Sequence, residues 1–560
     1  MNVSITIRHC GETTTLRAEA GTPLAPLLRE AGLLTLPCGV GKCGKCLILA
    51  ATEPCAEERA LLGDAALASG LRLACYTRAA EGLDIALPQA GALRVLTRFA
   101  QSDYPFRPIV ERRPFAMPEP SLDDQRSDLQ RLIDACGAKG HALGLGQLAA
   151  LPAFIRNARS NGGCGDGHGN VCGFGLMHGE TLVGYTASDE AYALIVDIGT
   201  TTVAALLVDT ARRRVVAARG EHNAQSPYGA DVISRIRHET EWEEHRNGPN
   251  PLQQAIAKQV SAMLAGLLEQ AGIGDVDFLS LTGNTTMMHL LCGLPGEHIG
   301  KAPFIPATLE PMRLPAADLG IASQAPAFLL PGISAYIGAD IVASLLAADA
   351  HRSQPPFLLV DLGTNAETVL CASGTLYACS AAAGPCFEGG MAGQDGAIDT
   401  VSPDPERGLS FTTIGDAPAR GLCGSGVLDA LALLLDAGIV DETGRLEADA
   451  SPLGARITDD ALTFTDSVRF TQKDIREVQL AKAAVRAGID ILLREAGMET
   501  ADVARLYLAG GFGSAMRPES AARIGLIPEE LSDRVTVLGN AAGSGALRYA
   551  TEEGAAESAL

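Results

Sequence analysis

The sequence predicts a multidomain α/β protein, and three observations support this fold class. The chain has 560 residues, which is too many for a single hydrophobic core. Four cysteines near the N-terminus have the spacing of metal ligands, and an apolar strand that leads into an Asp-x-Gly-Thr turn occurs twice further on. We therefore expect a cysteine-rich domain at 1–92, a linker at 93–125, a small middle domain at 126–188 and a duplicated α/β domain at 189–560.

The composition limits the kinds of partner. Hydrophobic residues make up 47% of the chain and charged residues 20%, which is typical of a soluble globular protein. The net charge of −22 argues against nucleic acid as a partner, because phosphate contacts need a basic surface. The uncharged window 321–339 contains prolines and glycines, so we expect no membrane insertion. The sequence starts without a signal-peptide pattern, so its 14 cysteines indicate metal ligands and thiols, not disulfides, in a cytoplasmic protein.

The N-terminal cysteines define the first candidate site. Cys38, Cys43 and Cys46 are separated by four and then two residues, and 28 residues lie between Cys46 and Cys75. This is the C-x₄-C-x₂-C…C ligand set of a plant-type [2Fe–2S] cluster. The glycines among the cysteines suit a loop that folds tightly around a cluster and directs backbone N–H groups at its sulfurs.

The same stretch contains a false phosphate-loop motif. Residues 39–46 read G-x-x-x-x-G-K-C, one letter away from the G-x-x-x-x-G-K-[ST] loop. Cys46 lacks the hydroxyl that would hold magnesium, and the apolar run 47–50 reads as a strand where the phosphate loop needs a helix. We therefore expect nucleotide binding elsewhere in the chain.

The elements predicted around the cysteines form a small α/β unit. They are a hairpin of strands at 3–7 and 13–17, a helix at 23–30, and strands at 47–50 and 83–87. This order resembles the β-grasp fold of plant-type ferredoxins. The resemblance implies that the four cysteines hold a [2Fe–2S] cluster and that Cys10 and Cys55, outside the pattern, are ordinary thiols.

The next two segments are less regular. Prolines at positions 105, 108, 114, 118 and 120 are expected to interrupt any regular element of the linker. A helix is then predicted from Ser121 to Ala135, with an apolar stripe of Leu122, Leu129, Leu132 and Ile133. Further on, Cys164, His168 and Cys172 follow one another at four-residue steps in a glycine-rich run. They are either metal ligands that lack an evident fourth partner, or incidental thiols of a loop.

The segment 189–560 contains the repeated strand and turn. The first copy reads Asp197-Ile-Gly199-Thr200-Thr201-Thr202 after its strand, and the second reads Asp361-Leu-Gly363-Thr364-Asn365. Glycine lets the backbone approach a phosphate closely, hydroxyl and N–H groups donate to its oxygens, and aspartate binds magnesium directly or through water. A third element, the strand 506–509 that leads to Gly510 and Gly511, strengthens this interpretation.

These three motifs resemble the phosphate-1, phosphate-2 and adenosine motifs of the superfamily that joins acetate and sugar kinases, heat-shock chaperone ATPases and actin. The resemblance implies ATP bound with Mg²⁺ between two lobes. The residues that it implies are Asp197 and Asp361 for magnesium, Gly199 to Thr202 and Gly363 to Asn365 for the phosphates, and Gly510 and Gly511 for the adenosine. Glu367 is a candidate catalytic base. The alternative is that this side chain only faces the cleft and has no catalytic role.

Other candidates have a competing structural explanation. Gly424, Ser425 and Gly426 precede a helix at 427–435, whose N-terminus would face a phosphate or ribose. Helix initiation with close packing explains these residues equally well.

A long helix opens with a capping-box pattern, Thr471-x-x-Asp474, and extends to Glu495. In this superfamily the helix before the adenosine motif often contacts the adenine side, which makes Gln479 and Lys482 candidates. A solvated charged face is the more ordinary explanation for Lys482.

The run from Thr282 to His289 ends a strand and starts a helix. Asn284 is a candidate to line the cleft. Met287 and Met288 are expected in the core, and His289 is expected to be structural.

The order of the domains carries a more specific resemblance. A ferredoxin-like N-terminus, a middle region and this ATPase domain resemble the reductive activators of corrinoid-dependent methyltransferases. The sequences that match are Asp197-Ile-Gly-Thr-Thr-Thr, Gly229-Ala-Asp-Val-Ile-Ser-Arg235, Thr282-Gly-Asn-Thr-Thr and Leu508-Ala-Gly-Gly-Phe-Gly. The match spans nearly the whole chain, but Cys164 and Cys172 are not part of it.

This resemblance implies ATP-dependent reductive activation of a corrinoid protein, in which the [2Fe–2S] cluster passes one electron to Co(II) to give Co(I). ATP binding or hydrolysis would act by shifting a conformational equilibrium. The implied partners are a corrinoid protein or corrinoid-dependent methyltransferase and an upstream electron donor; a homodimer through the ATPase domain is left open. Three other functions stay open: an ATP-dependent electron donor to another low-potential metalloenzyme, a redox-regulated metabolite kinase, and an electron-transfer protein with a degenerate ATPase domain.

Overall fold

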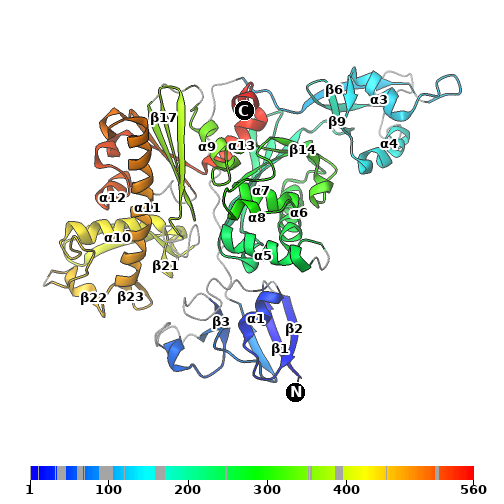
Figure 1. Ribbon diagram of the computed structural model, residues 1–560. Coiled ribbons are helices and arrows are strands. Elements are labelled where there is room, and N and C mark those ends of the chain that lie inside the picture. Colours follow the sequence, from blue (N-terminus) through cyan, green and yellow to red (C-terminus); the bar gives the residue numbers. More distant parts are fainter. Residues whose placement is uncertain are drawn as a thin grey trace. The chain divides into compact units, whose positions relative to one another are not determined.

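The structure is a computed structural model (Figure 1). It describes residues 2–9, 12–31, 33, 46–59, 67, 70–87, 105–118, 120–157, 171–245, 249–350, 352, 356–384, 395–449, 451–510 and 516–560. Two compact units share the chain. The first comprises Met1–Arg94, His222–His245 and Pro355–Gly539, and the second comprises Val95–Glu221, Arg246–Gln354 and Asn540–Leu560.

The N-terminal sheet has five strands in the order β2-β1-β5-β3-β4. Its elements are β1 (Asn2–His9), β2 (Glu12–Glu19), α1 (Leu24–Glu30), β3 (Leu47–Ala50), β4 (Leu71–Leu73) and β5 (Leu83–Ala86). β1 and β2 form the antiparallel hairpin, and β1 pairs with β5 in parallel. The alternating Val3, Ile5 and Ile7 are buried against α1 and β3, as period-2 patterning predicts. The β-grasp prediction is confirmed.

The duplication is visible in two larger sheets. The second unit holds β12-β11-β10-β13-β15-β14, and the first unit holds β18-β17-β16-β25-β26. Their strands are β10 (Tyr192–Ile198), β11 (Thr202–Asp209), β12 (Arg214–His222), β13 (Phe278–Gly283), β14 (Met312–Pro315) and β15 (Pro326–Leu329), and β16 (Phe357–Leu362), β17 (Ala366–Ala372), β18 (Thr375–Ala381), β25 (Arg505–Ala509) and β26 (Val535–Gly539). Each sheet starts with a three-stranded antiparallel meander, β12-β11-β10 or β18-β17-β16. Two further strands then pair in parallel, β13 and β15 in the second unit and β25 and β26 in the first. The sheet of the second unit has one additional strand, β14, which is antiparallel to β15. The predicted pair of related halves is therefore confirmed.

Helices flank these sheets. In the second unit they include α6 (Pro251–Ala271), α7 (Thr285–Cys292), α8 (Glu297–Gly300), α9 (Ala339–Ala347), α13 (Ala541–Thr551) and α14 (Ala555–Ser558), and in the first unit α5 (Val232–His245), α10 (Gly424–Asp436), α11 (Gln472–Ala496) and α12 (Pro518–Arg523). α9 and α13 lie side by side, as Figure 1 shows. They approach so closely that a Cβ at Gly545 would lie 1.7 Å from the Ala343 carbonyl oxygen. The predicted capping box of α11 is present, with Thr471 and Asp474 bonding each other's backbone N–H groups.

Two small sheets complete the first unit. They are formed by β19 (Ala397–Asp404), β20 (Gly408–Thr413) and β21 (Gly421–Leu422), and by β22 (Ile457–Thr458), β23 (Ala461–Thr465) and β24 (Val468–Thr471). Among the described residues, no helix is long and apolar enough to cross a membrane.

A four-stranded sheet in the order β6-β8-β9-β7 precedes the first large sheet along the chain, and its first strand lies within the predicted linker. Its elements are β6 (Glu111–Met117), α3 (Asp128–Cys136), β7 (Gly140–His141), α4 (Leu145–Asn157), β8 (Val171–His178) and β9 (Thr181–Thr186). The prediction that prolines interrupt every element of 93–125 was wrong at Pro114, which lies inside β6. β6 is an edge strand, where a residue without an N–H group is tolerated. The division at 92, 125 and 188 stays a prediction.

The predicted start of the first middle helix was also wrong. Ser121 accepts hydrogen bonds from the Asp123 and Asp124 N–H groups in a local turn, and Leu122 is 90% exposed. The helix starts after Ser127, whose side chain accepts from the Gln130 N–H group at 3.1 Å. The sequence Ser-x-x-Gln at 127–130 is itself a capping-box pattern and could have indicated this start.

Candidate functional site

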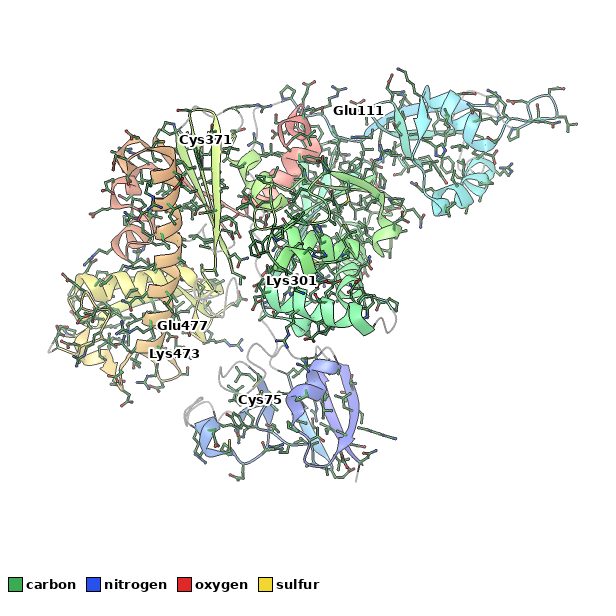
Figure 2. The ribbon with its side chains drawn as sticks, viewed as in Figure 1. Cys75, Glu111, Lys301, Cys371, Lys473 and Glu477 are labelled. Carbon is green, nitrogen blue, oxygen red and sulfur yellow. The ribbon has the colours of Figure 1, made fainter. Side chains whose placement is uncertain are left out.

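Two of the four predicted cluster ligands lie at one end of a β-ribbon. Cys46 directly precedes β3 and Cys75 closely follows β4, and these strands pair antiparallel with Leu47 opposite Leu73. The Ala74 N–H group donates to the Cys46 carbonyl at 2.8 Å. Figure 2 labels Cys75 on this domain. The two thiols thus fit a shared cluster, while Cys38 and Cys43 lie outside the described residues.

Buried charged side chains fix the ribbon that carries these cysteines. Glu58 is 3% exposed, and its carboxylate accepts from the Leu73 N–H at 2.7 Å and from the Cys55 N–H at 3.0 Å. Arg72 donates to the Thr52 carbonyl at 2.6 Å and the Leu67 carbonyl at 2.9 Å. Sequence reasoning missed Glu58 and Arg72, because a buried structural ion has no characteristic spacing. Cys55 is partly exposed, and burial of its thiol raises the pKa.

The first Asp-x-Gly-Thr turn joins β10 to β11. The Gly199 N–H group donates to the Thr202 carbonyl at 2.9 Å and closes the turn. A Cβ at Gly199 would lie 2.6 Å from that carbonyl oxygen, so the turn requires glycine. Thr200 is buried at 8% exposure, and Asp197 is paired with Thr282 of β13.

The second turn joins β16 to β17 and differs in register. The Gly363 N–H group donates to the Asn365 carbonyl at 2.9 Å. Asp361 is directly opposite Glu367, whereas Asp197 is opposite Ala204. Residues opposite one another on antiparallel strands project to the same face, with Cβ atoms about 5 Å apart. Only the second copy therefore offers a pair of neighbouring carboxylates.

A serine that the sequence did not indicate joins this pair. Ser380 of β18 is opposite Glu367, and its hydroxyl donates to Glu367 Oε1 at 2.9 Å. Asp361, Glu367 and Ser380 thus form a row across three strands. Ser380 could not be found from the motif, because it lies 13 residues beyond Glu367 and joins the row only through strand register.

The third motif follows β25. Gly510 has φ +113°, and a Cβ there would lie 2.2 Å from the Leu362 carbonyl oxygen, directly before the second turn. Its N–H group donates to the Gly539 carbonyl at 3.0 Å. Gly510 therefore packs the end of β25 against the end of β16, while Gly511 lies outside the described residues.

Gly424, Ser425 and Gly426 are the first residues of α10, which starts three residues earlier than predicted, and they are closely packed. Ser425 is 1% exposed, and its hydroxyl donates to the Asp399 carbonyl at 2.7 Å. A Cβ at Gly426 would lie 2.2 Å from the Ile398 carbonyl oxygen. The helix α10 begins against β19 here, so packing accounts for the types of residue at 425 and 426; a nucleotide role stays a prediction.

Gln479 and Lys482 have partners on neighbouring loops. Gln479 donates to the Thr443 carbonyl at 3.1 Å and accepts from Arg476 at 2.7 Å. The Lys482 ammonium donates to the Ile524 carbonyl at 2.7 Å, at the end of α12. Both side chains thus fasten α11 to its surroundings, and their contact with adenine stays a prediction.

The histidine that follows β13 is structural, as predicted. His289 is 3% exposed; its Nδ1 lies 2.7 Å from the Thr285 carbonyl, and its Nε2 accepts from the Ala307 N–H at 3.1 Å. Met287 and Met288 are buried in the core, also as predicted.

The cysteines of the middle segment are only partly described. Cys172, near the start of β8, is disulfide-bonded. The prediction that the cysteines are only metal ligands and thiols was therefore wrong at this position, and Cys172 is not available as a thiolate ligand in this state. Cys164 and His168 lie outside the described residues.

Comparison with known families covers most of the chain. The family described as 2Fe-2S iron-sulfur cluster binding domain matches residues 7–80, and the RACo linker region matches 100–161. The RACo middle region matches 192–353, and the C-terminal domain of RACo, the ASKHA domain, matches 356–559.

Individual relatives agree with this order. The corrinoid activation enzyme RamQ of Eubacterium limosum is 29% identical over 558 residues, covering 92% of this chain and 88% of that protein. The [Co(II) methylated amine-specific corrinoid protein] reductase of Methanosarcina barkeri is 31% identical over 225 residues, covering 35% and 39%. A solved reductive activator for corrinoid, iron-sulfur protein is 28% identical with a TM-score of 0.70, covering 100% of this chain and 94% of its own.

The fold and the candidate sites define an iron–sulfur protein joined to an ASKHA-type ATPase domain. Since the cluster domain and all three RACo segments occur in order, the chain belongs to the RACo family of reductive activators.

Proposed function

We propose that this protein activates a corrinoid protein by ATP-dependent reduction. One electron reduces Co(II) to Co(I), and the [2Fe–2S] centre that supplies it is oxidised by one electron. An upstream one-electron donor must then reduce the centre again. ATP and one water molecule are converted to ADP, phosphate and a proton, and this hydrolysis transfers no electrons.

One observation supports this proposal most directly. A cysteine pair suited to a cluster and a duplicated phosphate-binding fold occur on one chain, in the domain order of relatives named as corrinoid activators or reductases. A one-electron carrier alone needs no ATP. An ATPase domain is useful when its conformational change makes an unfavourable transfer possible, and the nucleotide must then bind two states with different affinity.

The proposed roles follow the local geometry. Cys38, Cys43, Cys46 and Cys75 would hold the cluster, which when bound supplies single electrons. Asp197 and Asp361 would hold Mg²⁺, and the N–H and hydroxyl groups of the two turns would bind the ATP phosphates. Glu367, oriented by Ser380, would accept a proton from the attacking water.

Partner-dependent ATP hydrolysis tests the function. The reduced full-length protein is mixed with MgATP and a corrinoid protein in its Co(II) state or its methylated Co(III) state, and phosphate release is measured. We expect stimulation by the Co(II) form only. Equal turnover with both forms, or formation of a phosphorylated metabolite when small substrates are added, would favour another acceptor or a metabolite kinase.

A further inference from the structure

The turn after β13 contacts the first phosphate turn directly. The Asn284 side-chain amide donates to the Thr200 hydroxyl oxygen at 3.0 Å. The same side chain caps α7, because its Oδ1 accepts from the Met287 N–H at 3.0 Å. Since the cap requires the oxygen at that position, the amide nitrogen is the atom that faces Thr200.

Close backbone packing holds Asn284 in this position. A Cβ at Gly283 would lie 2.6 Å from the Ile198 carbonyl oxygen, on the strand that leads into the phosphate turn. A Cβ at Gly338 would lie 2.6 Å from the Asn284 Cα atom. The turn is therefore fixed on one side by β10 and on the other by the N-terminus of α9.

A buried hydroxyl lies beside the predicted magnesium ligand. Thr282 is paired with Asp197 across β13 and β10, and paired residues project to the same face of a sheet. Thr282 is 0% exposed, and its hydroxyl oxygen has no hydrogen-bond partner within the described part of the chain. Buried hydroxyls without a partner are uncommon, and a ligand or its bound water is one usual explanation.

We propose that the junction of β13 and α7, Thr282-Gly283-Asn284, is a further part of the nucleotide site. Asn284 is a positioning residue, which holds the Thr200 hydroxyl so that its proton is directed at a phosphate oxygen. Thr282 supports the Asp197 side of the turn and donates to the water shell of a bound Mg²⁺. The assignment rests on the proposed ATPase function. It adds residues of β13 and its end to the phosphate-binding turn that follows β10.

A substitution that keeps the cap of α7 tests whether Asn284 positions the Thr200 hydroxyl. Serine is as good an N-cap as asparagine, but it cannot extend an amide to Thr200, so Asn284→Ser retains the fold. We expect it to weaken MgATP affinity about two- to tenfold, the worth of one hydrogen bond. Thr200→Val should weaken affinity at least as much, and adding Asn284→Ser to it should have no further effect.

The measurements separate positioning from structure. MgATP affinity is measured by titration calorimetry on the full chain, and thermal unfolding is followed by circular dichroism. Wild-type affinity in Asn284→Ser, or effects that simply add in the double variant, would overturn the positioning role. If the wild-type chain itself fails to bind MgATP, the proposed function fails and not merely this assignment.

The proposed role of Thr282 in Mg²⁺ binding has a separate test. Thr282→Val keeps the shape of the side chain and replaces the hydroxyl with a methyl group, so we expect a thermal unfolding temperature equal to or above that of the wild type, because the buried hydroxyl has no partner to lose among the described residues. The Mg²⁺ concentration that supports half-maximal ATP hydrolysis should rise about two- to tenfold. An unchanged Mg²⁺ requirement would contradict the role of Thr282 and leave that of Asn284 to its own test.

Discussion

At Gly510 the backbone alone decides which residue is allowed. Its φ of +113° and the Leu362 carbonyl oxygen, 2.2 Å from an added Cβ, both exclude a side chain. We expect Gly510→Ala to destabilise the first unit by about 3 kcal/mol, measured by urea unfolding, because a strained backbone and a collision combine. Gly374→Ala is the control, since Gly374 has φ +80° but no atom within 4 Å of an added Cβ. A loss there of about 1–2 kcal/mol would represent the φ strain alone; an equal loss at both positions would contradict the collision.

His289 makes stability depend on pH in a defined direction. Burial lowers the pKa of His289 below its usual 6.5, against the opposing effect of the Thr285 carbonyl. Protonation would also remove the acceptor that Nε2 offers to the Ala307 N–H group. The folded chain therefore binds this proton less readily than the unfolded chain, so the contribution is complete above pH 6.5 and is lost as pH falls below it. In His289→Gln, the free energy of unfolding measured in urea should fall less steeply from pH 7 to pH 5.5 than in the wild type. An equally steep fall in both proteins would contradict this role of His289.

Single residues show what the sequence could and could not predict. The cysteine spacing and both Asp-x-Gly-Thr turns were recognisable because their chemistry requires particular residue types at fixed intervals. Glu58, Ser380 and the contact of Asn284 with Thr200 were not predicted. They depend on strand register and on burial, which bring together residues that are far apart in the chain.

At the scale of elements, one arginine joins α13 to the C-terminal end of α9. Arg548 of α13 donates to the Leu346 and Ala347 carbonyls at 2.8 and 3.1 Å, which are at the C-terminal end of α9. It also forms ion pairs with Asp349 and with Glu552, the latter at 3.0 Å. The side chains of Arg548 and Glu552 are only 12% and 7% exposed, so removing the arginine leaves a buried carboxylate without its cation.

We expect Arg548→Met to lower the free energy of unfolding of the second unit by about 3–5 kcal/mol, in line with broken buried ion pairs. Urea unfolding measures this. The control is Lys473→Met on α11, whose 3.9 Å pair with Glu477 is exposed and is labelled in Figure 2. It should change stability by less than about 0.5 kcal/mol. A similar small effect at Arg548 would show that the buried pair contributes little.

Elements were predictable where periodicity and capping agreed. β3 was predicted with its observed bounds, and α11 was predicted from its capping box to within a residue. The errors occurred where a local turn imitated a helix start, at Ser121, and where an edge strand tolerated Pro114. Neither edge position nor competing turn geometry is encoded in the spacing of apolar residues.

At the scale of the whole molecule, the order of the parts carries the functional conclusion. A ferredoxin-like sheet and two related sheets with matching turns were all recognisable from sequence, because each has its own motif. The role of the four-stranded sheet was not recognisable, because Cys164, His168 and Cys172 gave no complete ligand set in the sequence and Cys172 is in a disulfide.

The most direct test of ATP-coupled reduction is anaerobic absorption spectroscopy. The pre-reduced full chain is mixed with a Co(II) corrinoid protein, with and without MgATP, and the Co(I) absorbance is followed. We expect Co(I) only with MgATP, none with Cys75→Ser or Asp361→Ala, and normal formation with Cys55→Ser, which lies outside the ligand set. Formation of Co(I) without ATP, or its absence despite an intact cluster and bound ATP, would contradict the proposed function.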